Sequence, residues 1–182
     1  MTTPTLLTLL RIGLIPVMVI VFFLPYTWSG IAAALVFSLG AITDWLDGYL
    51  ARRLGQTSAF GAFLDPVADK LMVAVALVLI VKDMPTVWTA VPAAVIIGRE
   101  ITVSALREWM AELGKSATVA VNMLGKIKTT CQITALIMLL FKYPLFSLPI
   151  IAIGHVMLYL AAALTLWSMV LYMKKAWPVL RF

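Results

Sequence analysis

Six apolar stretches, each close to the length needed to cross a bilayer, fill most of this 182-residue chain. They run at about 6–27, 31–51, 66–82, 86–106, 117–141 and 148–173. A helix needs ~20 apolar residues to span the hydrocarbon layer. Because 63% of the residues are hydrophobic and only 12% are charged, a water-facing fold could not bury this surface. The sequence therefore predicts an all-α polytopic membrane protein, with six transmembrane helices in one domain over residues 1–182.

The basic residues predict how these spans are oriented. With six spans and the N-terminus inside, the outer loops hold only Lys82 and Lys142, and the other lysines and arginines fall at inner ends. Cytoplasmic loops carry such an excess of basic residues. We therefore expect both termini in the cytoplasm. The net charge of +6 is explained by the same bias, so we expect no nucleic-acid partner.

The acidic residues are concentrated in one place. Four of the eight lie at the end of the second stretch and the start of the third: Asp44, Asp47, Asp65 and Asp69. A carboxylate at membrane depth costs about 2.5–3.5 kcal/mol on insertion scales, and clustered carboxylates also repel one another. The basic residues nearby in sequence, Arg52, Arg53 and Lys70, are too few to pair with them all. Divalent cations prefer oxygen ligands, so the cluster predicts a metal site.

Helical spacing places these aspartates on two faces that a short inner turn can bring together. One face carries residues at i, i+3, i+4, i+7 and i+8, namely Asp44, Asp47, Gly48, Ala51 and Arg52. The other follows steps of four through Gly61, Asp65 and Asp69. The small residues would let a ligand approach the backbone, and the planar guanidinium of Arg52 suits a phosphate.

Pro66 allows a different start for the third helix. Proline disfavours helical geometry in the preceding residue and is favoured in a first turn. On that interpretation the helix begins at Asp65, and the step from Gly61 to Asp65 is coincidental. Asp65 and Asp69, four residues apart, share one helical face on both interpretations.

The aspartates belong to a longer pattern, D-x2-D-G-x2-A-R-x8-G-x3-D-x3-D, in which every fixed position is met. This pattern resembles the signature of the CDP-alcohol phosphotransferase family. The surrounding sequence is most similar to the bacterial members that make phosphatidylglycerophosphate. The likeness is carried by PTLLTLLR at 4–11, ITDWLDGYLARRLGQTSAFGAFLDPVADKLMVA at 42–74, GREITVSALREWMAELGK at 98–115 and GKIKTT at 125–130.

The resemblance implies a six-helix bundle, usually a homodimer, in the bacterial inner membrane, with a polar cavity facing the cytoplasm. The implied reaction is phosphatidyl transfer from CDP-diacylglycerol to sn-glycerol 3-phosphate, giving phosphatidylglycerophosphate and CMP. The implied cofactors are two Mg²⁺ or Mn²⁺ ions held by Asp44, Asp47, Asp65 and Asp69. Asp69 would also act as the general base. The implied CDP-binding residues are Asp44, Asp47, Gly48, Ala51, Arg52 and Gly61.

The phosphate of the acceptor needs cations of its own. By resemblance, Arg107 and Lys126 are expected to bind it, with Arg99 and Lys128 as secondary candidates. The alternative for the secondary pair is that both side chains extend to lipid phosphates. Glu100 is expected to pair elsewhere in the bundle.

Two other functions compete with this assignment. The same chemistry could use another acceptor alcohol, such as serine or inositol phosphate. Intramembrane carboxylates can also mark an ion-coupled transporter, although acids at one membrane edge favour chemistry on a lipid headgroup. No serine, cysteine or histidine arrangement offers a covalent route. The single histidine, His155, is expected to be a packed or hydrogen-bonded helix residue.

Overall fold

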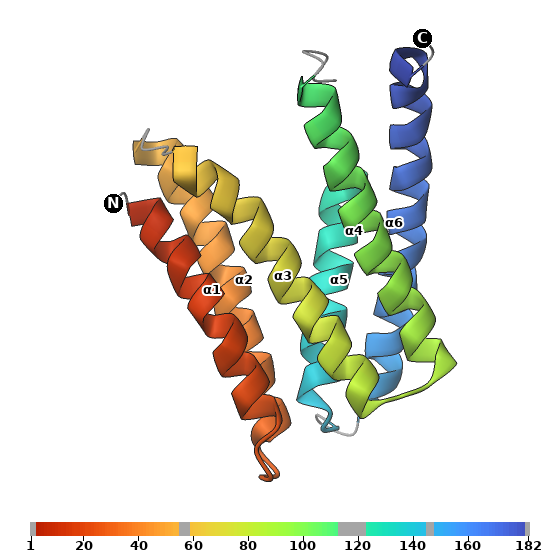
Figure 1. Ribbon diagram of the computed structural model, residues 1–182. Coiled ribbons are helices and arrows are strands. Elements are labelled where there is room, and N and C mark those ends of the chain that lie inside the picture. Colours follow the sequence, from red (N-terminus) through yellow and green to blue (C-terminus); the bar gives the residue numbers. More distant parts are fainter. Residues whose placement is uncertain (1–2, 55–58, 113–122, 145–147, 181–182) are drawn as a thin grey trace.

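The computed structural model describes residues 3–54, 59–112, 123–144 and 148–180. Over these ranges the chain forms six helices and no β-strand (Figure 1). Each predicted apolar stretch corresponds to one helix, which confirms the all-α prediction. The start of the stretch expected at 117–141 lies outside the described residues. The helices are α1 (Thr3–Phe22), α2 (Ser29–Leu54), α3 (Ala59–Asp83), α4 (Val87–Glu112), α5 (Met123–Phe141) and α6 (Ile150–Leu180).

Helix length and hydropathy indicate a membrane protein. Within the described ranges, three helices are long and apolar enough to cross a membrane: Ser29–Tyr49 of α2, Val87–Glu112 of α4 and Ile150–Lys174 of α6. Helices α1 and α5 contain shorter apolar segments. Large apolar side chains also point outward on several helices, including Ile20, Leu35, Val78, Trp88 and Trp167. Such extensive apolar surface suits lipid rather than water.

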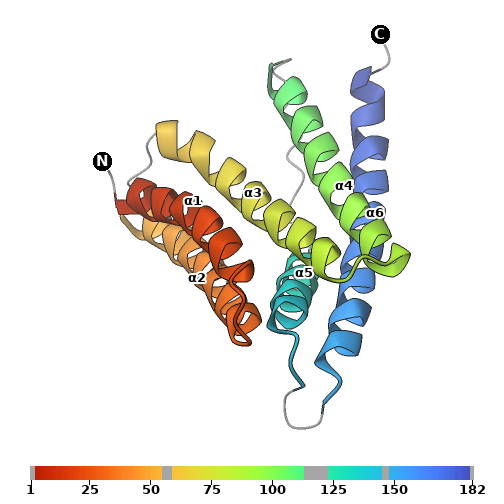
Figure 2. The same cartoon turned by 60° about the horizontal axis from the view of Figure 1, so that its bottom comes forward.

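Helix α3 contacts α1 and α2 on one side and α4 and α5 on the other. Helix α1 packs along α2 and α3, while α5 packs along α6 and α2, and α4 packs against α6. The C-terminal half of α3 approaches α4 and α5, whereas its N-terminal half lies beside α1 and α2 (Figures 1 and 2). Both chain termini lie at one end of the bundle, and we call this the terminal end (Figure 1).

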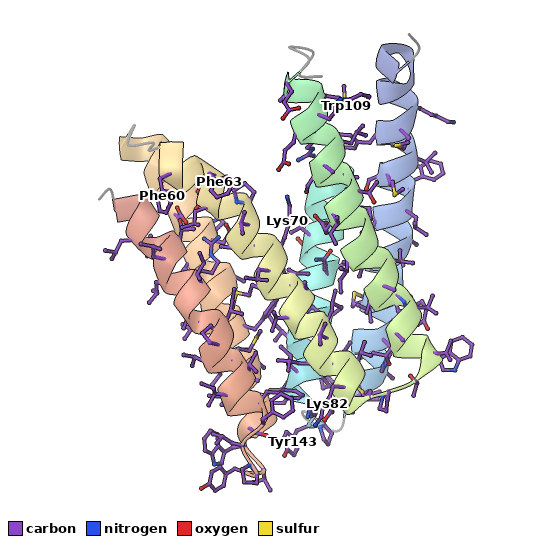
Figure 3. The ribbon with its side chains drawn as sticks, viewed as in Figure 1. Phe60, Phe63, Lys70, Lys82, Trp109 and Tyr143 are labelled. Atoms are coloured by element: carbon purple, nitrogen blue, oxygen red, sulfur yellow. The ribbon has the colours of Figure 1, made fainter. Side chains whose placement is uncertain are left out.

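All six helices contribute to one apolar core. Fully buried side chains include Met18, Leu77, Ile96, Leu136 and Leu158. Lys82 and Tyr143 both lie at the end of the bundle opposite the termini (Figure 3). There the ammonium of Lys142 lies 2.7 Å from a carboxylate oxygen of Asp83. The core and this ion pair hold the helices together, and the four predicted aspartates lie toward the terminal end.

The contact between α2 and α5 depends on a glycine. A Cβ atom at Gly30 would lie 2.8 Å from the carbonyl oxygen of Leu140, closer than packed atoms approach. We therefore expect Gly30→Ala to push the two helices apart and to destabilise the protein by about 1–3 kcal/mol. A thermal melt in detergent measures the loss. Gly13→Ala is the matched control, because a Cβ there meets nothing within 4 Å. Equal midpoints for the two variants would contradict the prediction.

Candidate active site

Helices α2 and α3 bring the four predicted aspartates against two polar residues of α1, Arg11 and Thr8. Arg11 is only 1% exposed, and its Nη2 donates to Asp47 Oδ2 at 2.9 Å. Its Nη1 lies 3.2 Å from Asp44 Oδ1 and also donates to Asp69 Oδ1. One turn earlier on α1, the hydroxyl of Thr8 contacts Asp47 at 3.2 Å and also Asp65. We call Asp44, Asp47, Asp65 and Asp69 the acidic cluster.

The acidic cluster combines a buried side and an open side. Asp47 is buried against Arg11 and Thr8, whereas the side chains of Asp44 and Asp69 are 50% and 45% exposed. One guanidinium balances one of the four carboxylates, so an excess of negative charge remains. Such a set of hard oxygen donors suits Mg²⁺ or Mn²⁺ chemically. Three of these carboxylates contact Arg11 and the fourth, that of Asp65, contacts Thr8. In this arrangement no group of three or more acidic, histidine or cysteine side chains among the described residues is placed to hold a metal ion.

The alternative start of α3 at Asp65 is wrong. Helix α3 begins at Ala59 and continues through Pro66, so Gly61, Asp65 and Asp69 do share one helical face. Gly61 is buried, and Asp65 contacts Thr8. The burial of Gly61 and the contact of Asp65 with Thr8 hold the first turns of α3 against neighbouring helices. This packing offsets the cost of the one backbone hydrogen bond that Pro66 removes from the helix.

The other residues of the signature lie on the same two helices. Gly48 is half-buried on α2, one residue beyond Asp47. Ala51 and Arg52 lie in the last turns of α2, but their side chains fall outside the described part of the structure. The spacing prediction therefore holds for the backbone of the signature.

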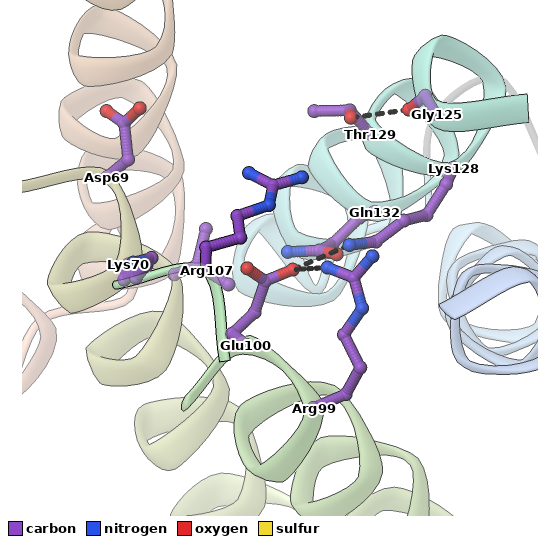
Figure 4. A pocket seen from close by; sticks show the side chains of 10 residues that line it. Asp69, Lys70, Arg99, Glu100, Arg107, Gly125, Lys128, Thr129 and Gln132 are labelled. Carbon is purple, nitrogen blue, oxygen red and sulfur yellow. Dashed lines mark hydrogen bonds and ion pairs between the residues drawn. The ribbon is translucent and has the colours of Figure 1, made fainter. Parts of the chain in front are cut away.

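A second group of charged side chains lines a cavity of about 370 Å³ between α3, α4 and α5, which we call the cation-lined cavity (Figure 4). Three of the four residues expected to bind the acceptor phosphate, Arg99, Arg107 and Lys128, line it. The fourth, Lys126, lies on α5 with its side chain outside the described part. Sequence reasoning did not assign Thr129 or Gln132 to any site, and it treated Lys70 only as a neighbour of the aspartates. All three line the cavity.

Glu100 ties two of these cations together. Its Oε1 accepts from Arg99 Nη1 at 2.8 Å and from Lys128 Nζ at 2.6 Å (Figure 4). Arg99 also donates from Nη2 to Ser168 Oγ of α6 at 2.8 Å. Lys128 is only 7% exposed. The alternative that Arg99 and Lys128 extend to lipid phosphates is therefore wrong: both side chains are held inside the bundle, and Glu100 is their shared partner.

Arg107 enters the cation-lined cavity from the last turns of α4. Its guanidinium lies 4.9 Å from the ring centre of Tyr172 on α6 and donates a hydrogen bond to the hydroxyl of that residue. A guanidinium held over an aromatic ring keeps donors free for another acceptor. Arg107 is exposed, so a ligand entering from the terminal end can reach it.

Asp69 connects the two groups of charges. A smaller cavity of about 100 Å³ is lined by Arg11 and Asp44 on one side and by Thr129 and Gln132 on the other. Asp69 lines both this cavity and the cation-lined cavity. A hydroxyl compound with an anionic group could therefore place the anion among the cations of α4 and α5 and its hydroxyl beside Asp69.

His155 lies apart from both cavities. Its Nδ1 donates to the carbonyl oxygen of Ile151 at 2.9 Å, and its Nε2 lies 3.2 Å from the hydroxyl oxygen of Thr89. The expectation that His155 is a hydrogen-bonded helix residue is confirmed.

Comparison with known proteins agrees with the sequence signature. The model of the CDP-alcohol phosphatidyltransferase family matches residues 1–167. A CDP-diacylglycerol–glycerol-3-phosphate 3-phosphatidyltransferase of Pseudomonas fluorescens is 55% identical over 182 residues, 100% of this chain and 93% of the relative. Proteins of the same name from Escherichia coli (strain K12) and Shigella flexneri serotype 5b (strain 8401) are 54% identical over 173 residues, covering 95% of this chain and 93% of each relative. The chain belongs to the CDP-alcohol phosphatidyltransferase family.

Proposed function

We propose that this protein transfers a phosphatidyl group from CDP-diacylglycerol to sn-glycerol 3-phosphate, releasing CMP and phosphatidylglycerophosphate. The names of relatives more than half identical over nearly the whole chain support this choice of substrates. The observation that carries the proposal is the position of Asp69, which lines both the small cavity beside the acidic cluster and the cation-lined cavity. The nucleotide lipid and the acceptor would meet at this side chain.

The reaction is an in-line displacement at phosphorus. The acceptor hydroxyl oxygen forms a bond to the phosphorus that carries diacylglycerol, and the bond from this phosphorus to the CMP oxygen breaks. Asp69 would accept the hydroxyl proton as general base. Asp44, Asp47, Asp65 and Asp69 would hold two Mg²⁺ or Mn²⁺ ions, a requirement that the family resemblance implies. Such ions neutralise the charge that develops on the attacking and leaving oxygens.

The two substrates would use different helices. The cytidine diphosphate would lie against α2 and the start of α3, where small residues leave room beside the backbone and where Arg52 offers a guanidinium. Its binding residues would be Asp44, Asp47, Gly48, Ala51, Arg52 and Gly61. The acceptor phosphate would bind in the cation-lined cavity through Arg107 and Lys126, with Arg99 and Lys128 in supporting roles.

In the membrane, we propose six spanning helices in a single domain over residues 1–182, with both termini in the cytoplasm. The terminal end of the bundle would then open to the cytoplasmic side of the bacterial inner membrane, where a water-soluble acceptor is available. The protein would act as a homodimer. These features follow the positive-inside bias of the basic residues and the resemblance to the family.

Acceptor incorporation tests the proposed function. Purified protein receives CDP-diacylglycerol, Mg²⁺ or Mn²⁺, and one labelled alcohol: glycerol 3-phosphate, serine or inositol phosphate. We expect label from glycerol 3-phosphate alone to enter lipid, with equimolar release of CMP in detergent. Incorporation of serine or inositol phosphate in its place would assign a different acceptor. Solute flux in sealed vesicles, without CMP release from CDP-diacylglycerol, would favour the ion-coupled transporter.

Substitution of Arg107 tests the acceptor site. We expect Arg107→Ala to raise the KM for glycerol 3-phosphate by at least about tenfold, because a hydrogen bond to a charged group is worth about 1.5–3 kcal/mol. The KM for CDP-diacylglycerol should change less than about twofold, because the nucleotide lipid is proposed to bind at α2 and α3 and not at Arg107. Lys174→Ala, which removes an exposed positive charge from α6, controls for the general loss of charge. Equal changes in both KM values would assign Arg107 a structural role.

A further inference from the structure

Gln132 has a buried oxygen with no partner. The residue lies on α5, one turn after Lys128, and its side chain is 5% exposed. Its amide oxygen Oε1 is buried and accepts no hydrogen bond from any described residue. Gln132 nevertheless lines both the cation-lined cavity and the small cavity, as Asp69 does (Figure 4). A buried acceptor without a donor is unfavourable, so its position at a cavity points to a ligand that supplies the donor.

The surroundings of Gln132 restrict which ligand group can do so. Phosphate oxygens of an ionised ester only accept hydrogen bonds, so a phosphate cannot satisfy Oε1, whereas a hydroxyl can. The cations that suit a phosphate line one cavity shared by Gln132, and the carboxylate of Asp69 stands at the junction of the two. Gln132 therefore lies between a site for the phosphate of the acceptor and a site for its reacting hydroxyl.

We propose that Gln132 binds the middle hydroxyl of the acceptor and so selects a three-carbon alcohol that carries it. This inference rests on the proposed function, in which the acceptor is sn-glycerol 3-phosphate. That molecule has its phosphate at one end, a primary hydroxyl at the other and a secondary hydroxyl between them. With the phosphate among the cations and the primary hydroxyl at Asp69, the secondary hydroxyl donates to Gln132 Oε1. A site built to bind a hydroxyl discriminates against an analogue that lacks it, because its own polar group is then left unpaired.

The probe for this role is 3-hydroxypropyl phosphate, which retains the phosphate and the primary hydroxyl but lacks the secondary hydroxyl. For the unmodified protein we expect kcat/KM to favour glycerol 3-phosphate over this probe by about tenfold or more. Gln132→Leu should lower kcat/KM for glycerol 3-phosphate about tenfold and leave that for the probe within about twofold. The preference should thus be nearly abolished, with the KM for CDP-diacylglycerol unchanged.

Thr165→Val is the matched control. Thr165 is also buried with an unpartnered side-chain oxygen, but it is not among the described residues that line either cavity. Both substitutions replace a buried polar group by an apolar one of similar size. We expect Thr165→Val to keep the kinetics of both acceptors. If Gln132→Leu does not yield folded protein, Gln132→Met repeats the test with an unbranched side chain of similar length.

Two outcomes would overturn the role of Gln132. The first is an unchanged preference in the Gln132 variants, whether activity with both acceptors falls equally or not at all. The second is a preference below about twofold in the unmodified protein. Failure of the proposed function has a different signature. In that case the unmodified protein would release no CMP from CDP-diacylglycerol with glycerol 3-phosphate.

Discussion

Replacing Asp69 by asparagine is expected to lower kcat about 1,000-fold while leaving the helix bundle folded. General-base catalysis contributes about 10²–10⁴-fold, and an amide cannot accept the hydroxyl proton. Asparagine has the size of aspartate and can still accept a hydrogen bond from Arg11, whose guanidinium contacts Asp69. The substitution also relieves repulsion from Asp44, so we expect no loss of stability. Release of CMP under saturating substrates measures turnover.

The control lies on the same helix. Asp83→Asn makes the identical change at the far end of α3, where Asp83 pairs with Lys142 away from both cavities. It should retain near-normal turnover. If Asp69→Asn retained comparable turnover, Asp69 would not be the base. A parallel loss in both variants would instead point to a general effect on α3.

Removing Arg11 is expected to have the largest effect on stability. Its guanidinium contacts Asp44, Asp47 and Asp69 from a fully buried position. Arg11→Met leaves these carboxylates facing one another without a counter-charge. Loss of one partner from a buried ion pair costs about 3–5 kcal/mol. We expect about 3 kcal/mol, because two of the carboxylates are half-exposed, and a thermal midpoint about 10 °C lower in metal-free detergent.

Divalent ions should change the thermal midpoint of the unmodified protein and that of Arg11→Met by different amounts. Arg11 occupies carboxylate oxygens that an ion would need, so in the unmodified protein the guanidinium and the ion compete. Without Arg11 the ion is the available counter-charge, and we expect Mn²⁺ to raise the midpoint of Arg11→Met by more than that of the unmodified protein. Lys70→Met, which removes a half-buried charge beside Asp69, is the control. Equal Mn²⁺-induced shifts in all three proteins would contradict direct competition at the acidic cluster.

The acidic cluster could be predicted because its geometry is local. Asp44 and Asp47 share a helical face, as do Asp65 and Asp69, and a short connection between two helices lets the faces meet. The role of Arg11 could not be predicted in the same way. It lies 36 positions before Asp47 in the sequence, and no periodicity in the sequence indicates how α1 packs against α2 and α3. The sequence therefore indicated too few basic residues nearby to pair with all four aspartates.

The contacts inside the cation-lined cavity could not be predicted from the sequence either. Charge and resemblance were enough to select Arg99, Arg107 and Lys128. A charged side chain in an apolar stretch is costly, so its presence indicates a functional or structural role. Arg99 and Lys128 share one oxygen of Glu100 because of the way in which α4 and α5 pack in the bundle. Sequence spacing does not determine that packing. Gln132 has no charge and lies in an apolar stretch, so nothing in the pattern separated it from an ordinary helix residue.

The division of the cavities among the helices has a consequence for how acceptor preference can change. Asp69 stands on α3 at the junction of the two cavities, so we expect a substitution of Asp69 to affect both substrates together. Arg107 on α4 and Lys128 on α5 line the cation-lined cavity and are not among the described residues that line the small one. We therefore expect a variant with altered alcohol preference to be obtained most readily at positions of α4 and α5 that line only the cation-lined cavity, because such changes leave the acidic cluster untouched.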